Sequence, residues 1–192
     1  MAKKQYIRVL TPEFTISYPN LVEPKIGLNA AQGPQYSCKM LFKKDLSGKN
    51  LEAFKELRAA IKKVAVEAFG DPLPKALWNP LIDGDSKDDP TCAGHWTLNA
   101  KTKMRPGVVN AKLRELTEQE ITELVYPGAV CRATILVSAF DAPGAKGVTC
   151  LLQNIQLLRD GDLLVAKRDA SSDFTATEDS DFSESESEEE GW

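Results

Sequence analysis

A two-residue alternation of apolar and polar side chains runs through four separate stretches of the chain, residues 14–18, 36–42, 95–103 and 129–140. This period is typical of a β-strand with one buried face, because successive side chains point to opposite sides of a sheet. Residues 147–158 are apolar enough for a fifth strand, but Gln153 and Asn154 interrupt the run and leave its inward face ambiguous. The alternation therefore predicts a mainly β domain.

Two other stretches follow a helical period. Residues 50–69 place apolar side chains at steps of three and four and stop before Gly70, which predicts an amphipathic helix packed on the sheet. Residues 117–125 begin with Thr117 and Glu120 in the spacing of a capping box, which predicts a short helix. The β body therefore carries two helices.

Segments rich in proline, glycine and acidic residues are expected to connect these elements. Pro19 and Pro24 should close the first strand, residues 26–35 should form a loop, and the N-terminal residues should form a short basic arm. Residues 71–92 should be a connection, in which 83–89 form a solvated acidic loop. A calcium loop is not favoured there, because glycine and glutamate do not occupy the positions that such a loop requires.

The order of these elements favours one architecture. With helix 50–69 treated as an insertion, the order becomes β-β-β-α-β-β, with helix 117–125 between strands three and four. This is the order of a five-stranded OB-fold barrel, whose strand 2–3 face binds oligonucleotides. Several other β-rich α+β folds share the order. The expected class is mainly β with helical insertions.

Charge is segregated along the chain. Residues 169–192 carry ten acidic residues and no Lys or Arg, so residues 1–168 hold a net charge of +6 within the total of −4. An acidic segment of this kind repels itself and cannot bury apolar surface, which predicts disorder. We therefore expect a folded domain over 1–168 and a disordered tail over 169–192, with Trp192 as its last residue.

Several function classes are disfavoured. The four cysteines are isolated in sequence, no C-x-x-C pair is present and His95 is the only histidine, so neither a metal site nor a cofactor is expected. The sequence contains no P-loop, no nucleophile elbow and no dinucleotide fingerprint, which argues against an enzyme. No apolar run approaches the ~20 residues of a membrane helix, so a soluble intracellular protein without a membrane partner is expected.

Cations and aromatic side chains instead favour binding to an extended nucleic acid, which needs charge for phosphates and flat rings for bases. The candidate DNA-binding residues are Lys39, Lys43, His95, Lys101, Lys103, Arg105, Arg132, Phe140 and Lys146. The candidate base-stacking residues are Tyr36, Trp96 and Tyr126, with Tyr18 as a further aromatic candidate. Parity places Trp96 and Tyr36 on the apolar faces of their strands, which favours the core for both. Phe140, beside a Pro-Gly turn, is the better candidate for an exposed aromatic.

The acidic tail has a role in the same hypothesis. A tethered anionic segment reaches a millimolar effective concentration at a cationic groove, so it should occupy the groove until DNA displaces it. Trp192 could then anchor the tail in an apolar pocket of a replication protein. The alternative is a solubility tail whose terminal Trp has no role.

Short motifs across the body resemble the single-stranded DNA-binding proteins of tailed bacteriophages, OB-fold proteins with an acidic C-terminal tail that ends in an aromatic residue. The motifs are Thr11-Pro12, Ser17-Tyr18-Pro19, Tyr36-Ser37, Lys43-Lys44, Leu81-Ile82-Asp83-Gly84-Asp85, Leu98-Asn99-Ala100-Lys101-Thr102, Arg105-Pro106-Gly107-Val108, Tyr126-Pro127-Gly128, Lys146-Gly147-Val148 and Leu152-Gln153-Asn154.

The resemblance implies a protein that coats single-stranded DNA in phage replication and recombination without catalysis. It also implies contacts of the tail with a DNA polymerase or helicase, often a homodimer, and a location in the cytoplasm of the bacterial host. Other classes stay open: an acidic-tailed adaptor that never touches nucleic acid, an RNA-binding OB protein, and a nuclease or other enzyme.

Overall fold

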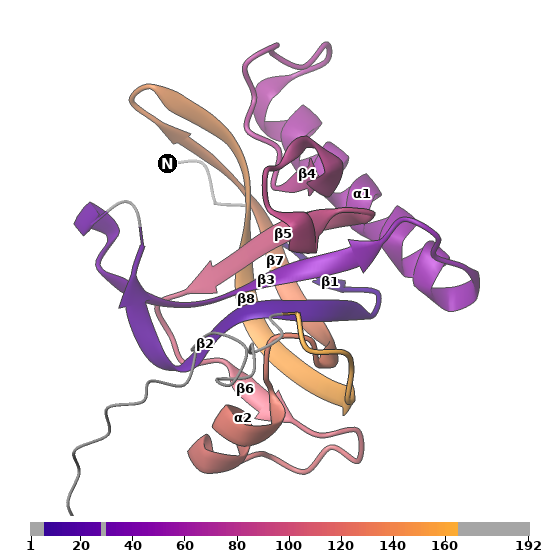
Figure 1. Ribbon diagram of the computed structural model, residues 1–192. Coiled ribbons are helices and arrows are strands. Elements are labelled where there is room, and N and C mark those ends of the chain that lie inside the picture. The colour runs from indigo at the N-terminus through magenta and orange to yellow at the C-terminus, as the bar shows by residue number, and fades with distance from the viewer. Residues whose placement is uncertain (1–5, 28–29, 165–192) are drawn as a thin grey trace, which may run out of the picture.

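The computed structural model describes residues 6–27 and 30–164 (Figure 1). These residues form a mainly β structure, which confirms the class expected from the alternation. The strands are β1 (Tyr6–Leu10), β2 (Phe14–Ile26), β3 (Pro34–Lys43), β4 (Leu81–Asp83), β5 (His95–Thr102), β6 (Gly107–Val109), β7 (Val130–Ala142) and β8 (Ala145–Arg159). The α-helices are α1 (Gly48–Phe69) and α2 (Glu118–Leu124), and short 3-10 turns lie at Ala30–Gln32, Gly84–Ser86 and Pro90–Cys92.

Five of the strands form a closed circuit of hydrogen-bonded neighbours. The order is β2, β3, β5, β8 and β7, and β7 pairs with β2 again. Within the circuit only β5 and β8 run parallel to each other. The remaining strands attach outside it: β1 to β7, β4 to β5 and β6 to β8. Each strand of the circuit therefore has one face toward the interior and one toward the outside.

The interior of the circuit and the underside of α1 share one apolar core. Phe42 lies at its centre, with ring centroids 5.8 Å from those of Phe14 on β2 and Phe54 on α1. Helix α1 packs against β1, β7 and β8, whereas α2 packs against β2 and lies at the opposite end of the molecule in Figure 1. The α2 helix begins with the predicted capping box of Thr117 and Glu120.

Three strands were not predicted from the sequence. β1 lies in the stretch expected to be a basic arm, β4 lies in the expected connection 71–92, and β6 follows the third predicted strand. The structure therefore has an eight-stranded sheet where five strands were expected. β4 and β6 are only three residues long, which is too short to show a period, and the five residues of β1 do not alternate because only Arg8 among them is charged.

The expectation that Pro19 and Pro24 close the first strand was wrong. β2 continues through both prolines to Ile26, and its pairing with β3 shifts between Ser17 and Asn20 and again between Asn20 and Lys25. Each proline lies within one of these irregular stretches. Because the ladder is interrupted there, the missing proline N–H removes no regular hydrogen bond.

A bulge resolves the ambiguous fifth predicted strand. Ile135 pairs with Leu152 and Thr134 pairs with Asn154, so Gln153 is the extra residue on β8. The bulge reverses the alternation, and the buried residues accordingly change from even-numbered positions before it to odd-numbered positions after it. Those positions are Val148, Cys150, Leu152, Ile155 and Leu157.

Three of the cysteines, Cys38, Cys131 and Cys150, behave as small apolar residues, whereas Cys92 Sγ donates to Asp89 Oδ2 at 3.5 Å. Cys38, Cys92, Cys131 and Cys150 are all buried free thiols, and burial raises the pKa of Cys131 and of Cys150 to about 12. Within 6–27 and 30–164, no group of three or more potential ligands is arranged to hold a metal ion. None of the helices in these ranges has the length and apolar character needed to cross a membrane.

Candidate nucleic-acid interface

The outer faces of β3 and β5 bring four of the predicted DNA-binding residues together. In the antiparallel register Lys43 pairs with His95, Lys39 with Asn99, and Ser37 with Lys101. Paired residues on neighbouring strands emerge on the same face, so Lys39, Lys43, His95 and Lys101 share one surface. The parity read from the sequence places them there correctly, because both strands are regular over this region.

Tyr18 presents an aromatic ring at the edge of this surface. The residue is 63% exposed, although Ile16 and Ser17 before it are buried. Its backbone has φ +48° at the irregular stretch of β2, a left-handed conformation that is unusual for a bulky residue. Strain of this kind is concentrated at functional sites. The Lys39 ammonium lies 4.8 Å from the centre of the ring.

We call Tyr18, Ser37, Lys39, Asn99 and Lys101 the β3–β5 strip. One end of it is held by side-chain hydrogen bonds: the Lys101 ammonium donates to Gln32 Oε1 at 2.8 Å, and the Asn20 amide donates to Ser37 Oγ at 3.2 Å. The strip combines an exposed ring, two ammonium groups and neutral hydrogen-bonding groups. These are the parts that bind phosphates and unstacked bases.

Residues 83–89 keep their acidic side chains at least partly exposed, in keeping with the predicted solvated acidic loop, but they also make contacts that the sequence did not predict. β4 and the two 3-10 turns that follow it pack against β5, and Thr97 Oγ1 donates to the Ile82 carbonyl oxygen of β4 at 3.3 Å. Lys39 forms an ion pair with Asp89 at 3.3 Å. Hydrogen bonds from Thr91, with a further one from Lys39, lower the pKa of Asp89 to about 2. The carboxylate therefore stays charged beside Lys39 at neutral pH.

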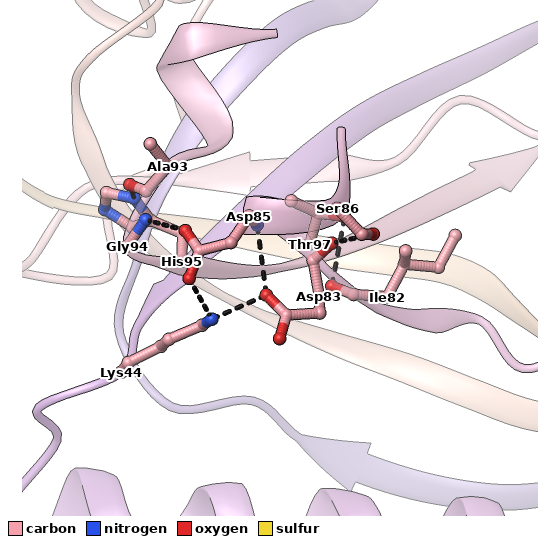
Figure 2. Close-up of polar contacts among 9 residues, drawn as sticks. All are labelled: Lys44, Ile82, Asp83, Asp85, Ser86, Ala93, Gly94, His95 and Thr97. Carbon is pink, nitrogen blue, oxygen red and sulfur yellow. Dashed lines mark hydrogen bonds and ion pairs between the residues drawn. The ribbon is translucent and has the colours of Figure 1, made fainter. Parts of the chain in front are cut away.

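A second lysine is held by two carboxylates of the same connection, as Figure 2 shows. Lys44 Nζ lies 2.5 Å from both Asp83 Oδ1 and Asp85 Oδ2. The hydrogen bonds to Lys44 lower the pKa of both carboxyl groups, and the same bonds raise the pKa of Lys44. Asp85 also accepts a hydrogen bond from the Gly94 N–H at 2.7 Å. The sequence reading did not identify Lys44 as a site residue or predict its carboxylate partners.

His95 lies in the same cluster (Figure 2). Its Nδ1 is 2.7 Å from the Ala93 carbonyl oxygen, which can only accept, so Nδ1 carries the proton in this contact. Two lysines are thus neutralised locally by Asp83, Asp85 and Asp89. The open cations of the surface are Lys43 at the end of β3 and Lys101 in the strip.

The three candidate stacking residues are half-buried. Trp96 packs against Phe54 of α1 at 6.4 Å between ring centroids, and Lys44 and Arg58 lie over its ring. The Tyr126 hydroxyl donates to the Gly161 carbonyl oxygen and accepts from the Gly161 N–H. Tyr36 shares the inner parity of Cys38 and Met40. Each of the three is placed by the fold itself, whereas Tyr18 is the exposed member of the aromatic candidates.

The remaining candidates lie elsewhere. Arg132 and Phe140 are on β7, which the circuit separates from β3 by β2 on one side and by β5 and β8 on the other. Arg132 Nε donates to Gln156 Oε1 at 2.6 Å, and Arg105 forms an ion pair with Glu118. Lys103 and Lys146 are exposed, just beyond β5 and near the tip of the β7–β8 hairpin. The predicted set is therefore divided between different parts of the surface.

The predicted tail, 169–192, and Trp192 lie outside the described residues. No structural contact is therefore assigned to them.

Comparisons with known proteins give one family. Residues 7–183 match the family model described as "Enterobacter phage Enc34, ssDNA-binding protein". The structure is similar to that of the single-stranded DNA-binding protein from bacteriophage Enc34, with 25% sequence identity and a TM-score of 0.68 over 86% of this chain and 88% of that one. No curated protein sequence matches the chain.

Two further structures share the fold at lower identity. The Enc34 protein in complex with ssDNA has 23% identity and a TM-score of 0.69, with 85% of this chain and 99% of that chain covered. The single-stranded DNA-binding protein gp2.5 of bacteriophage T7 has 13% identity and a TM-score of 0.63, with 91% and 98% covered.

Proposed function

Because the chain belongs to the phage family of the Enc34 ssDNA-binding protein, we propose that it binds single-stranded DNA without sequence preference. In this role it coats and protects the strand during phage replication and recombination, and it performs no chemistry. The β3–β5 strip is the observation that carries the proposal, because it places the exposed Tyr18 ring beside the Lys39 ammonium on a surface that also holds Lys101.

The proposed architecture is an OB-type barrel over residues 1–168. The circuit β2-β3-β5-β8-β7 supports it, with β3 and β5 as the second and third strands in chain order. Helix α2 lies between β5 and β7 in the chain, as the predicted order requires. In OB folds the face formed by the second and third strands binds oligonucleotides, and the β3–β5 strip lies on that face.

Titration with oligo-dT at several salt concentrations tests the proposal. Binding should weaken as salt rises, with a log–log slope of roughly −0.7 for each phosphate neutralised on a single strand. Duplex DNA of the same length should compete poorly, and an RNA oligomer distinguishes an RNA-binding protein from a DNA-binding one. If neither single-stranded nucleic acid binds at low salt, the proposal fails and an adaptor function is favoured.

We infer that residues 169–192, with their charge of −10, compete with DNA for the cationic surface. Deleting them should tighten oligo-dT binding, most clearly at low salt where attraction between exposed charges is least screened. A full-length variant with the ten acids replaced by their amides should behave like the deletion. Unchanged or weaker affinity in both variants contradicts the competition.

Trp192 is the proposed anchor for a phage DNA polymerase or helicase. Trp192→Ala should leave oligo-dT binding unaltered and should weaken capture of the purified polymerase or helicase. If the Trp192→Ala variant and the unaltered chain capture the polymerase or helicase equally well, Trp192 is not the anchor. The same family relationship favours a homodimer. Sedimentation equilibrium would measure the mass of the assembly and so test this.

A further inference from the structure

Trp78 presents its indole outside the β3–β5 strip. It lies in the connection between α1 and β4, and 56% of it is exposed. Among the described aromatic residues only Tyr18 is more exposed. A single exposed apolar side chain is common on protein surfaces, so exposure alone assigns no role to this residue.

The backbone of Trp78 is held by hydrogen bonds, although more than half of the residue is exposed. The Trp78 N–H donates to the Lys146 carbonyl oxygen at 3.0 Å, and the Trp78 carbonyl oxygen accepts from the Val148 N–H at 3.0 Å. These two bonds join Trp78 to Gly147 as a parallel bridge. A side chain at Gly147 would not fit, because its Cβ would lie 2.4 Å from the Trp78 carbonyl oxygen and 2.5 Å from Trp78 Cβ.

The residues around Trp78 suit an unstacked strand. Gly147 pairs with Trp78 on one side and with Phe140 of β7 on the other. Trp78 and Phe140 therefore lie on either side of one glycine. Lys146, which directly precedes Gly147, is exposed. A ring on a fixed backbone loses little freedom on binding, and an aromatic with a nearby cation is the combination that holds single strands.

The position of Trp78 relative to the strip is set by β8. Lys101 of the strip pairs with Leu151, and Trp78 bridges to Gly147 on the same strand. Four residues of a β-strand span about 13 Å. This distance is within reach of the roughly 4–16 nucleotides that one OB fold covers. A strand that crosses the strip can therefore reach Trp78 along the outer surface of β8.

We propose that Trp78 is a second base-stacking platform, which binds an unstacked base of the same DNA strand that contacts the β3–β5 strip. Phe140 borders this platform and Lys146 supplies a cation for the adjoining phosphate. The proposal rests on the proposed function and adds a binding residue to it.

The test compares Trp78→Ala, Trp78→Phe and the matched control Leu73→Ala in the full-length chain. Leu73 lies in the same connection and is 37% exposed. With oligo-dT of about 15 nucleotides, within the range that one OB fold covers, Trp78→Ala should bind about 5- to 150-fold more weakly. Trp78→Phe should retain most of the affinity, and Leu73→Ala should bind like the unaltered protein.

A spectroscopic readout separates stacking from an effect on folding. The chain has three tryptophans, so the double variant Trp96→Phe/Trp192→Phe leaves Trp78 as the only indole. Saturating oligo-dT should quench its fluorescence. If the protein binds DNA but Trp78→Ala binds normally and the indole is not quenched, the platform is refuted and the proposed function stands. If the unaltered protein does not bind oligo-dT, the proposed function itself is refuted.

Discussion

Replacing Tyr18 with alanine should weaken oligo-dT binding by about 1–3 kcal/mol, the usual value of one base stacked on an aromatic ring. This corresponds to an affinity about 5- to 150-fold lower. Tyr18 is 63% exposed and the centre of its ring lies 4.8 Å from the Lys39 ammonium, so a base could stack on the ring while Lys39 contacts the neighbouring phosphate. Fluorescence anisotropy with labelled oligo-dT measures the loss, and Tyr18→Phe, which keeps the ring, is the matched control.

Glycine at the same position separates binding from stability. The left-handed backbone of Tyr18, at φ +48°, costs a bulky residue roughly 1–2 kcal/mol, whereas glycine adopts it freely. Glycine also adds freedom to the unfolded chain, which costs about 0.4–1 kcal/mol. Tyr18→Gly should therefore keep the free energy of unfolding within about 1 kcal/mol of its original value while losing DNA affinity as Tyr18→Ala does. Full DNA affinity in both variants would remove Tyr18 from the interface.

Replacing Phe42 with alanine should lower the free energy of unfolding by about 3–5 kcal/mol, the range for a buried phenylalanine. Phe42 is fully buried, and its ring joins Phe14 of β2 to Phe54 of α1. The vacated volume would lie between Phe14 and Phe54, so both rings would lose a contact with Phe42. Urea unfolding followed by circular dichroism measures the change.

The control for this core substitution is Leu10→Ala, because Leu10 is 50% exposed on β1. It should change stability by no more than about 0.5 kcal/mol, as is usual at the surface. A loss below about 1 kcal/mol for Phe42→Ala, far from the usual core range, would mean that Phe14, Phe42 and Phe54 do not pack together in solution.

The long elements could be predicted because their sequences carry a clear period. Residues 36–42 and 129–140 alternate regularly and form β3 and β7, and residues 50–69 form most of α1. Short β4 is different: its three residues form a strand because β5 pairs with them. Such pairing depends on the assembled fold and leaves no local period to detect.

The candidate site could also be predicted only where the strands are regular. Parity placed Lys39 and Lys101 on one face, because the register of β3 and β5 is regular. The ion pair of Lys39 with Asp89 joins residues 50 positions apart, and nothing in the local sequence specifies such a contact. Arg132 is a DNA-binding candidate by its sequence, but the sequence alone does not tell that the closed circuit separates β7 from β3.

The carboxylates on the outer side of β5 have a consequence for the thermodynamics of DNA binding. A lysine that binds a phosphate releases a condensed cation from DNA, and this release produces the salt dependence. Lys39 and Lys44 first have to leave Asp89, Asp83 and Asp85, and the freed carboxylates attract cations in turn. The carboxylates therefore take up part of the cations that the DNA releases. The affinity for DNA should depend less steeply on ionic strength than the number of lysines on this surface implies.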